Sequence, residues 1–399
     1  MKKILLLLIL LIPINIYALD FPNIYSEKAI VYDLTDNKIL EQKGDNERTS
    51  IASLTKITTA IVAIENIDLL DETFVIEEYM LAGIPWDASV AGFKVGDTVS
   101  YRDILYGILL PSGADASNII AYKVAGSVDK FVNLMNKKVK ELGIENTNYE
   151  NTTGLESKNH YSTTYDVLTI LKYAMKDKTF KKIYTSKKYE TTNGLKFYST
   201  STGIGKKLNL DTSKILGSKT GYTSKAGTCI SAYFESNNHE FLLVTLKAPS
   251  ELSKGYHVQD AIALIDYIDQ SYGEQILIEK NHEIAKIKVN LSTIKEIIIK
   301  PNNNITKYLK NDYDKSKIKY EYEGLTEIDF KHNPKKSLGR ITYYYNGEIF
   351  HNEYVYLNEQ IKPDYKKIFN TYKEQIIVIA ATCLFGIFIT IFLLRKTLY

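Results

Sequence analysis

The sequence predicts an α+β fold for the larger, N-terminal part of the chain, then a small all-β domain and a C-terminal transmembrane helix. Strand-like runs at 28–34 and 228–235 lie on either side of several segments with apolar residues at helical spacing. From about Gln275 to Ile361 the composition changes to short alternating runs, which are typical of β-strands. Residues 376–394 carry no charge and are long enough to span a bilayer.

Length, charge and cysteine usage exclude several classes of protein. The chain has 399 residues, enough for two domains and additional segments. A net charge of +3 is too small to indicate nucleic-acid binding, and no basic cluster is interleaved with aromatic residues. Cys383 lies in the apolar run, which excludes a disulfide framework with Cys229. The six histidines lack ligand spacing, so we expect no metal ion and no other cofactor.

Both ends of the chain carry topological signals. A charged start, an apolar run and a small final residue predict a signal peptide over 1–18. The alternative is an uncleaved anchor helix, but the apolar run is short for a membrane span and Pro13 interrupts it. At the other end Arg395 and Lys396 follow the apolar run, so the positive-inside rule places that end in the cytoplasm. Residues 19–374 would then lie on the extracytoplasmic side of the membrane, with a single span.

These features divide the chain into five expected parts. They are a signal peptide (1–18), a mixed α and β domain (19–272), a β domain (273–361), a charged linker (362–375) and a transmembrane anchor (376–394). The β domain has no constellation of reactive residues, and we expect it to space the preceding domain from the membrane.

A hairpin leads to the first candidate site. Strand-like runs at 28–34 and 38–42 flank an Asp-Asn turn. In the helix that follows, Ser53 and Lys56 are three residues apart, which places both side chains on one helix face. A serine nucleophile needs a base, and lysine can serve only where burial or a nearby cation lowers its pKa from about 10.4. A solvated helix face is the alternative, but apolar residues after Ser53 favour a buried helix.

The second candidate site is a turn between two apolar helices at 104–110 and 116–125. The turn carries Ser112 between segments that should both be buried. A functional serine would explain a polar residue at this place. The alternative is an ordinary helical hairpin in which Ser112 or Asp115 caps the second helix.

Other elements surround these sites. Ser100 and Asp103 form a weak capping pattern before the helix at 104–110. Residues 82–96 are rich in small residues and glycine and indicate a loop near the site. Helices are also predicted at 128–142 and 167–175.

The third candidate site is the only Lys-Thr-Gly of the chain. We expect Lys219 on a strand beside the Ser53 helix, with Gly221 allowing a ligand to approach the backbone. The strands at 228–235 and 240–246 should then pair antiparallel, with Cys229 as a small buried residue. An exposed strand end is the alternative for Lys219.

The order and spacing of the three sites resemble those of the penicillin-recognising serine enzymes. The motifs are Ser53-Leu54-Thr55-Lys56, Ser112-Gly113-Ala114 and Lys219-Thr220-Gly221. More closely, the chain resembles the low-molecular-mass penicillin-binding proteins, the D-alanyl-D-alanine carboxypeptidases, over roughly 28–266. Further matching segments are 29–33, 109–113, 153–155, 161–163 with Asp166, and 217–221.

The resemblance implies a fold and a reaction. The fold is β-lactamase/transpeptidase-like, an antiparallel sheet flanked by helices, with the nucleophile helix buried between a helical lobe and the sheet. Ser53 would attack the carbonyl between two D-alanines of a peptidoglycan stem peptide and become an acyl-ester. Lys56 would accept its proton, and Ser112 would relay a proton to the leaving amine. β-Lactams would acylate Ser53 as covalent inhibitors.

The resemblance also implies substrate-binding roles. Lys219 would help to lower the pKa of Lys56 and, with Thr220, receive the terminal carboxylate of the substrate. The backbone N–H groups of Ser53 and Tyr222 would form an oxyanion hole. These roles would place the protein in peptidoglycan biosynthesis at the bacterial cell membrane.

Two positions depart from the family pattern. The second motif usually ends in Asn, whose amide holds the catalytic lysine and the substrate backbone, and here that position is Ala114. The family often has an arginine after the Lys-Thr-Gly hairpin to bind the carboxylate. Residues 253–257 occupy this region, where Lys254 or His257 could substitute or simply lie on the surface.

Two alternatives to a carboxypeptidase remain. A β-lactamase would need a further general base, typically in a Glu-x-x-Leu-Asn loop, and none occurs between Gly154 and Lys219. A catalytically weak penicillin-binding or wall-binding protein is supported by Ala114. Retention of the two serines and two lysines of the motifs opposes it.

Overall fold

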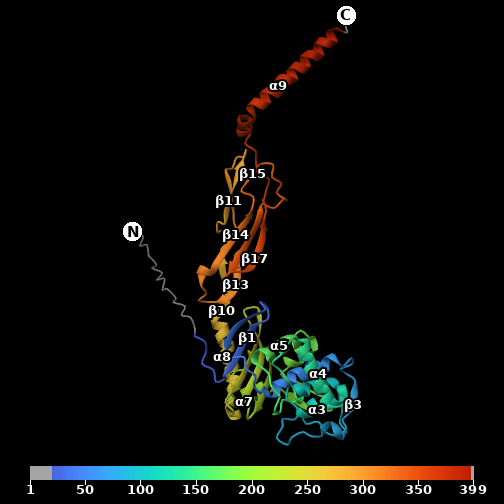
Figure 1. Cartoon of the computed structure of the whole chain (residues 1–399). Coiled ribbons are helices and arrows are strands. Elements are labelled where there is room, and N and C mark those ends of the chain that lie inside the picture. Colours follow the sequence, from blue (N-terminus) through green and yellow to red (C-terminus); the bar gives the residue numbers. More distant parts are fainter. Residues whose placement is uncertain (1–19, 397–399) are drawn as a thin grey trace, which may run out of the picture. The chain divides into compact units, whose positions relative to one another are not determined.

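A computed structural model describes residues 20–396, and the expected signal peptide at 1–18 lies outside the described residues. The chain divides into two compact units, Leu19–Ser271 and a second unit that contains Tyr272–Tyr399. Figure 1 labels the elements of both units.

A five-stranded antiparallel sheet lies at the centre of the N-terminal unit, in the order β2-β1-β9-β8-β7. Its strands are β1 (Lys28–Asp33), β2 (Lys38–Lys43), β7 (Gly217–Thr223), β8 (Gly227–Ser236) and β9 (His239–Ala248). The hairpins predicted near both ends of this unit are confirmed. Nearly every residue of β8 and β9 is buried, which requires cover on both faces of the sheet.

Helices cover the two faces of this sheet. Helix α5 (Thr164–Ala174) packs against β1 and β9, and α8 (Tyr256–Ser271) packs against β8 and β9. Figure 1 shows α8 and α5 on opposite sides of the sheet. The layers between the sheet and the helices are apolar, because side chains on both faces of the central strands pack against helices.

A buried helix, α1 (Thr55–Glu65), lies within the helical lobe. Every residue from Thr55 to Ala63 is buried, and α1 packs against α2 to α6. The other elements of the lobe and of its connections are β3 (Thr73–Val75), η2 (Glu78–Leu81), β4 (Thr98–Ser100), α2 (Tyr101–Leu109), α3 (Ala114–Ala125), α4 (Val128–Glu141), α6 (Lys178–Tyr184), β5 (Lys188–Glu190), β6 (Lys196–Tyr198), α7 (Thr200–Leu208) and η3 (Leu252–Lys254). The buried helix predicted after Ser53 is confirmed, although Ser53 itself lies in a 3-10 turn, η1 (Ala52–Leu54), directly before α1.

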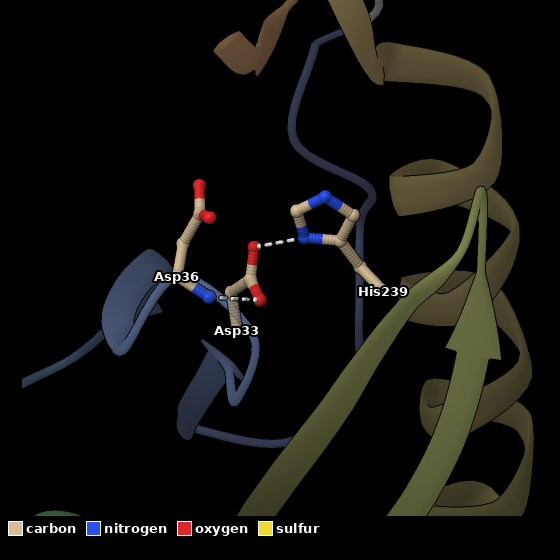
Figure 2. Close-up of side chains that lie close together, drawn as sticks. All are labelled: Asp33, Asp36 and His239. Atoms are coloured by element: carbon tan, nitrogen blue, oxygen red, sulfur yellow. Dashed lines mark hydrogen bonds and ion pairs between the residues drawn. The ribbon is translucent and has the colours of Figure 1, made fainter. Parts of the chain in front are cut away.

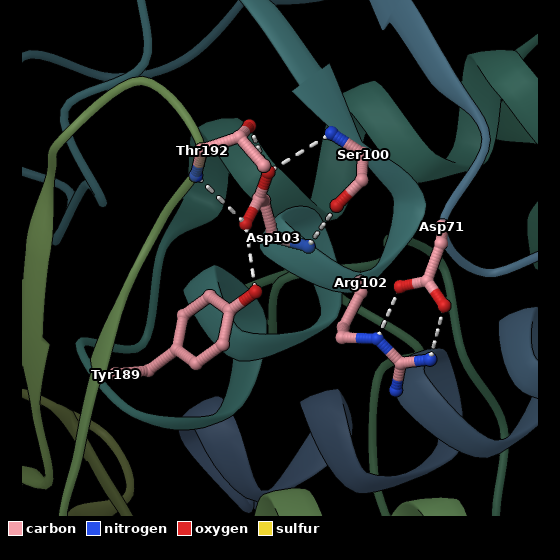
Figure 3. Close-up of polar contacts among 6 residues, drawn as sticks. All are labelled: Asp71, Ser100, Arg102, Asp103, Tyr189 and Thr192. Carbon is pink, nitrogen blue, oxygen red and sulfur yellow. Dashed lines mark hydrogen bonds and ion pairs between the residues drawn. The ribbon is translucent and has the colours of Figure 1, made fainter.

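A buried carboxylate connects α2 to the β5–β6 hairpin. Ser100 and Asp103 form a capping box at the start of α2, as their spacing predicts. The Asp103 carboxylate also accepts bonds from the hydroxyl groups of Tyr189 (2.8 Å) and Thr192 (2.6 Å). Figure 3 shows this network beside an exposed ion pair between Arg102 and Asp71. The cap therefore also positions the hairpin that leads into α7.

A second buried carboxylate joins the end of β1 to the start of β9. Asp33 Oδ1 accepts the backbone N–H groups of Thr35 and Asp36, and Asp33 Oδ2 lies 2.8 Å from His239 Nδ1 (Figure 2). Among the described residues, Asp33, Asp36 and His239 form a group whose ligand atoms lie within 4.8 Å of one another. One oxygen of Asp33 accepts the N–H groups of the turn and the other contacts His239, so we assign the group a structural role.

The C-terminal unit consists of small sheets and one long helix. The strands form the sheets β10-β13, β12-β11-β15 and β14-β16-β17 around an apolar core. Their bounds are β10 (Tyr272–Ile278), β11 (Ala285–Asn290), β12 (Glu296–Ile299), β13 (Ile305–Lys310), β14 (Ile318–Gly324), β15 (Glu327–Asp329), β16 (Gly339–Tyr345) and β17 (Glu348–Val355), with the turn η4 (Lys315–Lys317). Helix α9 spans Tyr365–Lys396, so most of the charged segment expected as a linker is helical. By length and composition its part Tyr365–Leu394 could cross a membrane.

Candidate active site

The three candidate motifs meet at one cavity of about 580 Å³ in the N-terminal unit. Side chains and backbone of the predicted site residues line it, namely Ser53, Lys56, Ser112, Thr220, Gly221 and Tyr222. Lys219 is fully buried directly behind this wall and contacts Ser112. Residues far apart in the sequence are brought together because η1 and α1, the α2–α3 turn and β7 pack against one another.

Ser53 is held by a strained backbone. Ala52, the residue before it, has a φ of +46°, which is unusual for a residue with a side chain. A Cβ on Gly154 would lie 1.9 Å from the Ala52 carbonyl oxygen, so only glycine allows the neighbouring loop to pack here. Strain of this kind persists only where the surroundings fix it.

A chain of hydrogen bonds holds the Ala52 carbonyl group in position. The Glu150 N–H donates to His160 Nδ1 (3.2 Å), which leaves the proton of the neutral ring on Nε2. His160 Nε2 then donates to Thr55 Oγ1 (2.8 Å), and Thr55 donates to the Ala52 oxygen (2.9 Å). Burial lowers the pKa of His160 to about 4, so the ring stays neutral near pH 7. No local motif pointed to His160.

Lys56 is placed to act as the base for Ser53. Its Nζ lies 3.0 Å from Ser53 Oγ and donates to the Thr153 carbonyl oxygen at 2.7 Å. Burial lowers the pKa of Lys56 to about 7, although the charge of Asp115 partly opposes the shift. A substantial fraction of Lys56 is therefore neutral near pH 7, as the proposed chemistry requires.

The Thr153 carbonyl is itself held in position. Asn151 Oδ1 accepts the backbone N–H groups of Thr153 (3.1 Å) and Gly154 (2.7 Å) and thereby shapes the loop. Residues 153–155 contribute to the family resemblance, but no sequence pattern predicts a role for this carbonyl. In the structure it orients the lysine toward the serine.

Lys219 and Ser112 form a second pair across the cavity. Lys219 Nζ donates to Ser112 Oγ and to the Thr220 carbonyl, both at 2.7 Å. Ser112 has a φ of +67°, so the α2–α3 turn presents its hydroxyl in a restricted backbone conformation. Burial lowers the pKa of Lys219 well below its usual range, and the charge of Lys56 adds to this effect. At Lys56 burial alone lowers the pKa, so the lowering by Lys219 that the resemblance implies is not found.

The second half of β7 and the Ser53 turn touch through their backbones. A Cβ on Gly221 would lie 2.9 Å from the Ser53 nitrogen, so the glycine permits this close approach. The N–H groups of Ser53 and Tyr222 thus belong to adjoining segments of the cavity wall. Thr220 Oγ1 lies 2.6 Å from Thr200 Oγ1 on α7, a neighbour that the sequence did not indicate.

Ala114 leaves one wall of the cavity without a polar side chain. It lies at the start of α3, is 2% exposed and lines the cavity. The next residue, Asp115, accepts the N–H groups of Ala91 (2.7 Å) and Gly92 (2.8 Å). Asp115 therefore anchors the loop predicted at 82–96, whose residues Asp87 to Ser89 also line the cavity.

The structure separates the two candidates for a carboxylate ligand after the Lys-Thr-Gly hairpin. His257 is buried, and it lines the cavity from the first turn of α8. Lys254 is exposed and does not line the cavity.

Comparisons with known proteins agree with this architecture. Residues 16–250 match the protein family described as D-alanyl-D-alanine carboxypeptidase. The D-alanyl-D-alanine carboxypeptidase DacF of Bacillus subtilis is 28% identical over 354 residues, which cover 84% of this chain and 86% of that protein. The D-alanyl-D-alanine carboxypeptidase DacA of Haemophilus influenzae is 30% identical over 57% of this chain and 58% of that protein.

Solved structures have the same fold. Penicillin binding protein 5 from Haemophilus influenzae has a TM-score of 0.60 at 23% identity, covering 87% of this chain and 99% of that one. A D-alanyl-D-alanine carboxypeptidase from Mycobacterium tuberculosis has a TM-score of 0.55 at 25% identity, covering 63% of this chain and 93% of that one. The predicted transpeptidase-like α+β fold, with its sheet flanked by helices, is confirmed.

Proposed function

The chain belongs to the D-alanyl-D-alanine carboxypeptidase family, and from this premise we propose that it removes the terminal D-alanine from peptidoglycan stem peptides. The observation that carries the proposal is the hydrogen bond between Lys56 and Ser53 at the cavity that Ser112 and β7 also line. A buried lysine with a lowered pKa beside a serine is a means of activating that serine.

Acylation would proceed by addition to the carbonyl and then elimination of D-alanine. Ser53 Oγ attacks the carbonyl carbon between the two D-alanines while Lys56 takes the hydroxyl proton. The N–H groups of Ser53 and Tyr222 stabilise the oxyanion of the tetrahedral intermediate. The C–N bond then breaks, Ser112 relays a proton to the leaving D-alanine nitrogen, and the shortened peptide remains as an ester on Ser53.

Deacylation would reverse these roles with water as the nucleophile. Water attacks the ester carbonyl, the active-site bases accept its proton, and Ser53 regains a proton as the shortened peptide leaves. Lys219, Thr220 and the approach permitted by Gly221 would hold the substrate's C-terminal residue during acylation, before that residue leaves. A β-lactam would acylate Ser53 by the same attack.

A catalytically weak penicillin-binding protein is the second candidate. One observation favours it: Ala114 offers no amide to the substrate backbone at the cavity wall. Acylation by penicillin needs Ser53 and Lys56, whereas hydrolysis of a peptide also needs accurate positioning of a flexible chain.

We also propose a single-pass membrane anchor at α9, with the N-terminal unit on the extracytoplasmic side. The support is the apolar helix and the Arg395-Lys396 pair that follows it in the sequence. The expected signal peptide and the domain bounds belong to the same proposal.

Intact-mass spectrometry tests the function. Full-length protein in detergent is incubated with a penicillin, then assayed for D-alanine release from a peptide that ends in D-Ala-D-Ala. One penicillin adduct on Ser53 with D-alanine release is expected, and Ser53→Ala should lose both while remaining folded. An adduct without D-alanine release would favour the weak penicillin-binding protein. Persistent labelling of Ser53→Ala would contradict Ser53 as the acyl acceptor.

A further inference from the structure

One backbone oxygen faces both groups that carry the proposed chemistry. The Thr153 carbonyl oxygen accepts a hydrogen bond from Lys56 Nζ at 2.7 Å and lies 3.4 Å from Ser53 Oγ. A neutral lysine has a single lone pair, and this lone pair must point at the serine hydroxyl to accept its proton. The bond to Thr153 fixes one N–H of the amine and so restricts the direction of the lone pair. The position of the Thr153 oxygen therefore decides how well Lys56 can act as the base.

The residue before Thr153 is held on two sides. The Thr152 carbonyl oxygen accepts the hydroxyl of Thr59 on α1 at 2.7 Å, and the Thr152 hydroxyl donates to Asn118 Oδ1 on α3 at 3.1 Å. Thr59 and Thr152 are both 0% exposed, so bulk water would not replace a bond that is lost here. We call Thr59, Asn118 and Thr152 the Thr152 network. It joins the loop that carries Thr153 to two helices of the lobe.

The Thr152 network starts from the same helices that form the site. Thr59 lies three residues after Lys56 on α1, so both side chains lie on one face of the helix. Asn118 lies four residues after Ala114 on α3, which places it about one turn beyond the cavity wall. Helix α3 has no polar side chain at Ala114 to offer the cavity, but through Asn118 it is still connected to the loop that holds the base.

The side chains of the Thr152 network do not line the cavity, although their loop does through Thr153, Gly154 and Leu155. An effect of these side chains on the reaction must therefore pass through the backbone of the loop. They are positioning residues rather than catalytic residues.

We propose that the Thr152 network positions Lys56 as the base, by holding the Thr153 carbonyl where it fixes one N–H of the lysine. The inference rests on the proposed function, since that function makes Lys56 the proton acceptor. If the network is broken, the lone pair is oriented less well and acylation slows. The protonated lysine also loses part of an acceptor. Because a hydrogen bond to the charged form favours that form, the pKa of Lys56 should fall below its value of about 7.

The charged and titratable groups around Lys56 stay the same in the test of this proposal. Asp115 on α3 raises the pKa of Lys56, and the charge of Lys56 lowers the pKa of Lys219 on β7. His160, in the segment before α5, is neutral near pH 7 because burial lowers its pKa to about 4. Each substitution in the test replaces one uncharged side chain by another, so a shift of the pH profile reports on the hydrogen bonds.

The first-order acylation rate of full-length protein in detergent is measured at saturating penicillin from pH 5.5 to pH 9. Thr59→Val, Thr152→Val and Asn118→Leu each remove one partner of the Thr152 network and keep a side chain of similar shape. Asn118 is half-buried, so Asn118→Leu tests the network even where a fully buried variant is too unstable. Thr58→Val is the matched control, because Thr58 is a buried threonine of α1 whose hydroxyl bonds to Tyr149 at 2.7 Å rather than to Thr152.

Each of the three network variants should lower the plateau rate by about tenfold or more, the scale of a misplaced reacting group. The inflection of the pH profile should move to lower pH by roughly half a unit to one unit, since one unit is a tenfold change in proton affinity. Thr152→Ser, which keeps the hydroxyl, should recover most of the rate that is lost in Thr152→Val. Thr58→Val should lower the free energy of unfolding without moving the inflection.

An unchanged rate and inflection in the folded network variants would overturn the inference. A slower rate with an unmoved inflection, or an equal shift in Thr58→Val, would also overturn it, because both results indicate a general loss of packing rather than a change at the base. If the unsubstituted protein is not acylated on Ser53, the proposed function fails, and the inference fails with it.

Discussion

Nζ of Lys56 lies 3.0 Å from Oγ of Ser53, and the lysine is only 2% exposed. The same burial that brings the two groups into contact also lowers the pKa of the lysine to about 7. A lysine that can lose its proton near neutral pH can accept one from the serine. The geometry and the electrostatics of this pair therefore have a single physical origin, the packing of α1 inside the helical lobe.

The first prediction concerns the pH dependence of acylation. Below its pKa Lys56 is protonated and cannot accept the Ser53 proton, so the rate should rise with pH and level off above about 8. The inflection should lie near 7. The measurement is the first-order acylation rate at saturating penicillin from pH 5.5 to pH 9, because saturation separates chemistry from pH-dependent binding. A flat profile over this range would show that Lys56 is not the base.

The second prediction concerns Gly221. A Cβ at this position would lie 2.9 Å from the Ser53 nitrogen, so Gly221→Ala should displace the N–H that faces the oxyanion. We expect acylation to slow by roughly 10²–10³-fold, the usual effect of losing one oxyanion donor. Gly203→Ala is the control, since it adds the same methyl group to the cavity wall with no atom within 4 Å. Equal rates in the two variants would contradict a close backbone contact at Gly221.

The third prediction concerns Ala114. Ala114 lines the same cavity as Lys56, so Ala114→Asn should place an amide near Lys56 and the substrate backbone. If that amide limits peptide hydrolysis, kcat/KM for D-alanine release should rise several-fold, as one new hydrogen bond of about 1 kcal/mol allows. Ala88→Asn, which adds the same amide to another part of the wall, should give no gain. Unchanged turnover in Ala114→Asn would mean that another group already fills this role.

The sequence predicts the catalytic motifs better than it predicts what holds them. Ser53 and Lys56 share a helix face, and Lys219 lies on a strand, so short patterns identify all three. The Thr153 carbonyl reaches Lys56 across 97 positions of the chain, and no local pattern encodes such a contact. His160 is 105 positions from Thr55, and its role depends on the tautomer that a backbone N–H selects.

Secondary structure shows the same limit. The hairpins and the buried helix can be predicted from the spacing of apolar residues, because this spacing depends only on neighbouring residues in one helix or one pair of strands. Helix α7 was not predicted because Gly203 and Gly205 disfavour a helix intrinsically. Tertiary packing favours the helix at this place, since Gly205 allows close contact with Thr212. The role of Asp115 was also missed, because its partners lie in a loop more than 20 residues earlier.

The last prediction compares two aspartates, Asp103 in α2 and Asp71 in the segment before β3 (Figure 3). Asp103 is fully buried, and each of its partners is a hydrogen-bond donor, including Ser100 N–H and the hydroxyl groups of Tyr189 and Thr192. In either orientation, Asp103→Asn would turn its NH₂ group toward a backbone N–H, that of Thr192 or that of Ser100, and this N–H would lose its acceptor. The free energy of unfolding should fall by about 1–3 kcal/mol, the cost of a buried unsatisfied group.

Asp71→Asn is the matched control for this change. Asp71 is 79% exposed in its side chain and pairs with Arg102 in water, where an ion pair contributes little. Chemical denaturation should therefore show a lower midpoint for Asp103→Asn and an almost unchanged midpoint for Asp71→Asn. Because Asp103 holds the β5–β6 hairpin that leads to Thr200 and the cavity, Asp103→Asn should also slow acylation. Equal midpoints would mean that the buried carboxylate does not hold the hairpin to α2.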